Sequence, residues 1–150
     1  MEYFAFQWHI TEACDQRCRH CYIYALGSHA KFKEMALEDM VTVIENCKTF
    51  CEKAGRLPYL YITGGDPILH PQFWTLMKIL KLADIPFALM GNPFHLTAEV
   101  CRKLRKYGCR KYRFPHQKHS PLRWKGLILL RNLRYCSLYR KYCCFALPLR

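Results

Sequence analysis

The sequence has no acidic residue after Glu99, although the chain is 150 residues long. Residues 100–150 contain fifteen Lys and Arg, whereas residues 1–99 contain nine, together with all eleven Asp and Glu. The net charge of +13 therefore belongs to the C-terminal third, and the remainder is slightly acidic. This asymmetry argues against a uniformly basic protein.

Long apolar runs are also absent, because charged residues interrupt each one well before the ~20 residues that a membrane-spanning helix needs. The first residues, Met1-Glu2-Tyr3, lack the basic segment and the small-residue cleavage site of a signal peptide. These absences predict a soluble, cytoplasmic protein without a membrane partner. In that compartment the ten cysteines are expected to be reduced thiols that bind a metal or cluster, rather than a disulfide framework.

Segments with strand and helix patterns alternate over the first 114 residues. The patterns predict strands at 2–11, 59–63, 86–90 and 110–114, and helices at 37–54, 71–83 and 97–107. The first strand is expected to be mostly buried on both faces. Strands joined by helices of this length pair in parallel, so the fold class is α/β with ligands at the carboxyl ends of the strands.

Individual residues mark where these elements start and stop. Thr97 is a good N-cap for the third helix, Pro71 suits the first position of the second, and Gly55 and Gly108 follow the first and third. The buried stripe of the first helix includes Cys47 and Cys51, which we interpret as core residues.

The alternation ends near residue 114. We therefore divide the chain into a core at 1–114 and a basic tail at 115–150, whose structure the sequence does not predict. Aromatic residues among the basic ones in this tail would suit stacking on nucleic acid, or contact with an acidic membrane surface. No recognisable motif accompanies them, so nucleic-acid binding is disfavoured.

Three cysteines, Cys14, Cys18 and Cys21, fall in one short loop directly after the first strand. This C-x3-C-x2-C spacing can hold three irons of a cubane cluster and leave the fourth iron without a protein ligand. A structural zinc site and ordinary buried thiols are the alternatives. Forty-three residues after Cys21, the second strand ends in Gly64-Gly65-Asp66-Pro67, a sequence that by itself also suits a tight strand-to-helix turn.

Together, the cysteine triplet and the glycine motif resemble the radical S-adenosylmethionine (radical SAM) superfamily. In that family a C-x3-C-x2-C loop follows the first strand of a partial (βα)6 barrel, and Gly-Gly-Glu-Pro ends the second. The resemblance covers roughly residues 1–114, with Asp66 in place of the usual Glu. The segments 7–11 and 19–22 look most like peptide-maturing members, some of which carry further clusters.

The resemblance implies a 4Fe-4S cluster on the three cysteines and S-adenosylmethionine bound at Gly64, Gly65 and Asp66. His20 would lie near the adenine, and Asn92 in a turn near the cofactor. No protein side chain is expected to be catalytic, since the implied reaction is reductive cleavage of the cofactor to a 5′-deoxyadenosyl radical. Its partners would be an electron donor and a peptide or small-molecule substrate, which the sequence does not identify.

Departures from the family pattern concentrate in the tail. A partial barrel normally needs about 200 residues, and the segment after Phe114 lacks the expected turn. We interpret residues beyond 114 as a truncated or out-of-frame remnant. An inactive fragment, or a non-catalytic metal- or nucleic-acid-binding protein, therefore remains an alternative. Extra metal sites are disfavoured, whether an auxiliary cluster on Cys136, Cys143 and Cys144 or a zinc on Cys109, His116 and His119.

Overall fold

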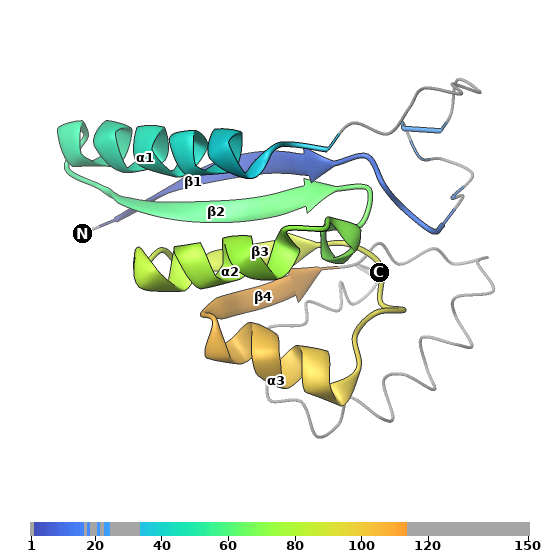
Figure 1. Ribbon diagram of the computed structural model, residues 1–150. Coiled ribbons are helices and arrows are strands. Elements are labelled where there is room, and N and C mark those ends of the chain that lie inside the picture. The colour runs from blue at the N-terminus through green and yellow to red at the C-terminus, as the bar shows by residue number, and fades with distance from the viewer. Residues whose placement is uncertain (1, 17, 19–20, 22, 25–33, 114–150) are drawn as a thin grey trace, which may run out of the picture.

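A computed structural model describes residues 2–16, 18, 21, 23–24 and 34–113 (Figure 1). Its elements run in the order β1 (Tyr3–Thr11), α1 (Leu37–Lys53), β2 (Leu57–Gly64), a 3-10 turn η1 (Pro67–Leu69), α2 (Phe73–Leu82), β3 (Phe87–Met90), α3 (Ala98–Lys106) and β4 (Cys109–Arg113). The predicted tail lies outside the described residues. The alternation of strand and helix predicted for the core is confirmed.

The four strands form one parallel sheet in the order β1-β2-β3-β4. Because each strand pairs with the next one in sequence, the sheet grows in one direction, as in a section of a βα barrel. All four strands point toward the end of the sheet from which the segment after Thr11 departs (Figure 1). Turns that follow β1, β2 and β3 therefore meet at this carboxyl edge.

The core lies between the sheet and its helices. Alternate strand residues and the inner faces of α1, α2 and α3 supply the buried apolar side chains: Trp8, Ile10, Met40, Ile44, Leu60, Ile62, Phe73, Leu76, Leu80, Phe87, Leu89 and Leu104. The prediction that β1 is buried on both faces is wrong. Tyr3, Ala5 and Gln7 are exposed, because the helices of the described part cover one face of this strand.

Most predicted helix ends are confirmed. The Thr97 hydroxyl accepts a hydrogen bond from the Val100 amide at 3.2 Å, which caps α3. Gly55 and Gly108 have φ of +64° and +95°, values that favour glycine after a helix. The second helix begins at Phe73, two residues later than Pro71 suggested, because residues 67–69 form a separate 3-10 turn.

None of the helices in the described residues combines the length and the hydropathy that crossing a membrane requires.

Candidate cofactor site

The cysteine loop begins immediately after β1 and is held by hydrogen bonds to its own backbone. The Thr11 hydroxyl accepts from the Ala13 amide at 3.0 Å. The Tyr24 hydroxyl lies 3.3 Å from the carbonyl oxygens of Glu12 and Cys14, so it ties the end of the described loop to its start. This side chain was not singled out in the sequence, where an aromatic residue three positions after Cys21 carries no specific signal.

All three loop cysteines are half-buried free thiols. Burial is the main cause that raises the pKa of the Cys14 and Cys18 thiols above the usual value. The charges interact along the loop, since Cys18 contributes to the raised pKa of Cys14, and Cys21 to that of Cys18. Thiols kept protonated by burial become good ligands when a metal cation compensates the thiolate charge, so their setting fits a metal or cluster site.

Gly64, the last residue of β2, and Gly65, which follows it, pack directly against the start of the cysteine loop. The Gly65 amide donates to the Thr11 carbonyl, and the Asp66 amide donates to the Ala13 carbonyl, both at 2.7 Å. A Cβ atom on Gly64 would overlap the Thr11 carbonyl oxygen, and one on Gly65 would overlap that of Ala13. Gly64 also has φ of +143°. Position 64 therefore needs glycine. At both glycines the backbone comes closer to the cysteine loop than an ordinary tight turn requires.

Asp66 is fully buried beside the cysteine loop. Its Oδ1 accepts a long hydrogen bond of 3.4 Å from the Ile68 amide, whereas Oδ2 has no hydrogen-bond partner among the described residues. Burial raises its pKa to about 6, an effect that the Ile68 amide and His95 partly offset. A buried carboxylate oxygen without a donor is costly, so this atom is well suited to receive a cationic group.

Asn92, at the tip of β3, is buried and makes three hydrogen bonds. Its Nδ2 donates to Asp15 Oδ1 at 2.8 Å, and its Oδ1 accepts from the Phe94 amide at 2.9 Å. The buried Tyr112 hydroxyl donates to its carbonyl oxygen at 2.9 Å. Asn92 thus lies in the turn after β3, and its contact with Asp15 connects this turn to the cysteine loop. Its place near a cofactor stays a prediction.

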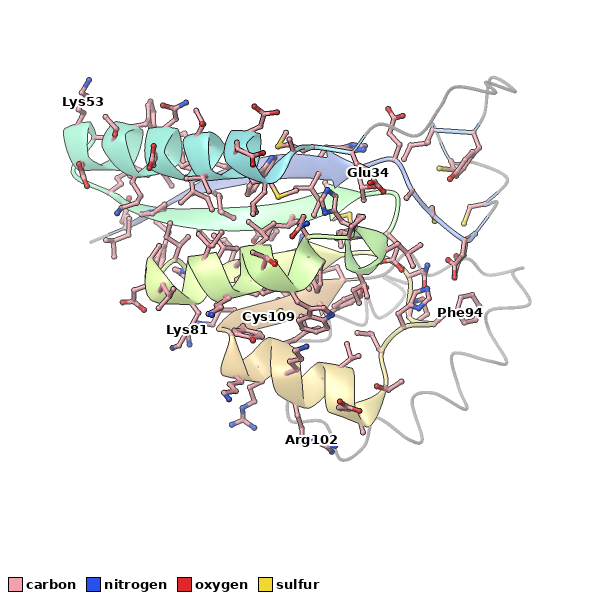
Figure 2. The ribbon with its side chains drawn as sticks, viewed as in Figure 1. Glu34, Lys53, Lys81, Phe94, Arg102 and Cys109 are labelled. Atoms are coloured by element: carbon pink, nitrogen blue, oxygen red, sulfur yellow. The ribbon has the colours of Figure 1, made fainter. Side chains whose placement is uncertain are left out.

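Two polar residues at this edge were missed in the sequence, Asp15 and His95. The Nε2 atom of His95 lies 2.8 Å from Asp15 Oδ2 and 3.8 Å from Asp66 Oδ2. One oxygen or nitrogen from each of these three side chains falls within 4.8 Å of the others. Figure 2 shows the neighbouring Phe94 beyond the strand tips, on the side of the cysteine loop. In the sequence, the signal that could have pointed to Asp15 was its position directly after Cys14.

The other predicted positions divide into two groups. Cys47 and Cys51 are buried in the core, as the helical pattern indicated, and Cys101 and Cys109 are buried there as well. His20 lies outside the described residues, and so do the remaining cysteines and histidines considered as extra metal sites, namely Cys136, Cys143, Cys144, His116 and His119.

Comparison with known proteins finds one family model, described as the radical SAM superfamily, that matches residues 8–141. Among curated proteins, mycofactocin maturase MftC of Mycobacterium tuberculosis (strain H37Rv) is 27% identical over 99 residues, which are 65% of this chain and 23% of that protein. The AdoMet-dependent heme synthase of Methanosarcina barkeri is 24% identical over 106 residues, covering 69% and 28%.

Among solved structures, the chain is similar to BtrN in complex with AdoMet and 2-DOIA. The TM-score is 0.66 at 14% identity, over 84% of this chain and 51% of that one, which establishes a shared fold. The chain spans about a quarter of the length of the curated relatives.

Proposed function

The chain belongs to the radical SAM superfamily, and from this premise we propose that it binds a 4Fe-4S cluster and S-adenosylmethionine at the carboxyl edge of its sheet. Cys14, Cys18 and Cys21 would each ligate one iron, and the fourth iron would remain open to the cofactor. When bound, the cluster supplies the electron that cleaves the cofactor to a 5′-deoxyadenosyl radical, which takes a hydrogen atom from the substrate.

The observation that carries this proposal is that Oδ2 of Asp66 has no hydrogen-bond partner among the described residues. This buried carboxylate follows the glycines that contact the cysteine loop, and it could accept from the ammonium group of the cofactor's methionine portion. Gly64 and Gly65 support this role because their missing side chains let the backbone approach the cysteine loop. The shorter Asp in place of Glu keeps the acceptor chemistry and is held in position by the Ile68 amide.

The substrate proposal is a peptide, in line with the peptide-maturing members that the sequence resembles. The similar proteins include both a maturase and a heme synthase, which supports assigning the shared segment to the radical machinery rather than to the choice of substrate. An electron donor would complete the reaction, and a cytoplasmic location would suit an oxygen-sensitive cluster. The boundary of the core at residue 114 and the nature of the tail remain predictions, although the family match extends to residue 141.

Anaerobic reconstitution with iron and sulfide tests the cluster assignment. We expect an iron–sulfur absorbance, an electron paramagnetic resonance spectrum that S-adenosylmethionine perturbs, and 5′-deoxyadenosine on reduction. Cys18→Ala should lose the cluster, whereas Cys51→Ala, which removes a thiol from the helical core, should keep it.

A full iron load in Cys18→Ala would contradict the ligand assignment. Zinc in place of a cluster would favour the non-catalytic metal-binding alternative, and a cluster without any 5′-deoxyadenosine would favour an inactive fragment.

A further inference from the structure

The carboxylate of Asp15 joins the cysteine loop to a distant part of the chain. Its Oδ1 accepts from Asn92 Nδ2 and its Oδ2 from His95 Nε2, each at 2.8 Å. The two donors follow Asp15 by 77 and 80 residues in the sequence. Because an ionised carboxylate can only accept, His95 must carry a proton on Nε2, and both contacts are short enough to be charge-assisted hydrogen bonds.

Asn92 gives this connection a rigid anchor. It is buried, and its carbonyl and side-chain oxygens are held by the Tyr112 hydroxyl and the Phe94 amide. On the opposite side, the cysteine loop is bonded to the tip of β2 through Gly65 and Asp66. The segment that carries Cys14 is therefore fixed between the ends of β2 and β3.

His95 extends the connection to the proposed ammonium site. Its Nε2 lies 3.8 Å from Oδ2 of Asp66 while it donates to Asp15. Asp15 thus holds the imidazole beside the proposed ammonium acceptor, and its own backbone adjoins the first proposed cluster ligand, Cys14.

We propose that Asp15 is a positioning residue that fixes Cys14 relative to the cofactor's ammonium site at Asp66. This inference rests on the proposed function. In this role Asp15 ligates neither the cluster nor the cofactor; it acts through Asn92 and His95. The loss of one charge-assisted hydrogen bond commonly weakens binding ~10-fold or more.

If the role of Asp15 were purely structural, its replacement would lower the midpoint of thermal unfolding. The side chains of Asp15 and His95 are 43% and 32% exposed, so their contact contributes little to the stability of the fold. Removing the Asp15 charge should therefore leave the midpoint of thermal unfolding nearly unchanged, while it loosens the geometry of the site.

The experiment compares Asp15→Asn, His95→Ala and the double variant as reconstituted full-length chains. Iron content, thermal midpoint and the dissociation constant for S-adenosylmethionine are measured for each, with Asp39→Asn on the exposed first turn of α1 as the matched control. We expect Asp15→Asn to keep its iron and its midpoint and to bind the cofactor ~10-fold more weakly, the effect of one lost charge-assisted hydrogen bond. The double variant should bind no more weakly than the weaker single one, because the two residues act as a unit.

Wild-type affinity in Asp15→Asn, or effects of the two substitutions that multiply, would overturn the proposal. Loss of iron in Asp15→Asn would also overturn it, since Asp15 would then act on the cluster itself.

A readout on the cluster-free protein separates this inference from the proposed function. Nitrogen-15 spectra of the His95 ring should show the Nε2-protonated form in the wild type and a tautomer mixture in Asp15→Asn. Unchanged ring signals would contradict the Asp15–His95 contact whatever the metal content. A wild-type chain that shows these signals but binds no cluster would instead refute the proposed function, and with it the role of Asp15.

Discussion

Replacing Asp66 with Asn should stabilise the cluster-free protein more at neutral pH than at acidic pH. The same substitution should remove the negative charge that pairs with the cofactor's ammonium group. The pKa of this fully buried carboxyl rises from 3.8 to about 6, chiefly because burial disfavours the charged form. Each pKa unit corresponds to ~1.36 kcal/mol, so the ionised carboxylate lowers the free energy of unfolding by about 3 kcal/mol above its folded-state pKa.

The sign of the pH dependence follows from the direction of the shift. The folded state binds a proton more tightly than the unfolded state, so the destabilisation is complete above about pH 6 and disappears as the pH falls toward 3.8. Asn has no charge at any pH. The free energy of unfolding of Asp66→Asn minus that of the wild type should therefore fall by about 2 kcal/mol between pH 8 and pH 4.

The absolute difference at pH 8 will be smaller than this change. Asn places an amide donor where Oδ2 lies, next to the donating His95 ring, and an unsatisfied buried donor costs ~1–3 kcal/mol. The cost of the unsatisfied donor is the same at every pH. The change of the stability difference with pH is therefore a better test than its absolute value.

Urea unfolding of the reduced, cluster-free protein, followed by circular dichroism at several pH values, measures this quantity. The same substitution at exposed Asp39 provides the matched control. A difference that stays constant with pH would refute the idea that Asp66 is a buried, ionised carboxylate. Unchanged cofactor affinity in reconstituted Asp66→Asn would refute its role at the ammonium group.

Two further predictions follow from the same site. Binding of S-adenosylmethionine to the reconstituted protein should weaken as the pH falls below about 6, because protonated Asp66 cannot pair with an ammonium; equilibrium dialysis at pH 5.5 and 7.5 checks this, and an equal slope in Asp66→Asn would contradict it. Gly65→Ala should lower both the thermal midpoint and the iron content, since its Cβ would overlap the cysteine loop backbone. In Gly55→Ala no atom lies within 4 Å of the added Cβ, but φ is +64°, so the substitution should cost about 1–2 kcal/mol and keep the iron. Iron loss in this variant as well would mean that instability, rather than overlap with the cysteine loop, empties the site.

The elements were predictable because their signals are local. Apolar residues recur at 3.6-residue spacing on α1, and a hydroxyl cap precedes α3, so neither depends on distant partners. The exposed face of β1 was not predictable, because its aromatic composition indicates a strand without showing how many faces are covered. The 3-10 turn at residues 67–69 was not predicted, because its N-cap, Asp66, is also part of the glycine motif.

The sequence by itself determined the parallel α/β pattern, the cysteine spacing and the glycine motif, because each is written in residues that are close along the chain. Only the tertiary structure decided that Asp15 meets Asn92 and His95 across 77 and 80 residues, since such contacts depend on which strand tips lie side by side. It also decided that Asp66 is fully buried and that one of its oxygens has no hydrogen-bond partner among the described residues. Removal from water is a property of the packed surroundings, and it gives this carboxylate a raised pKa and its capacity to receive a cation.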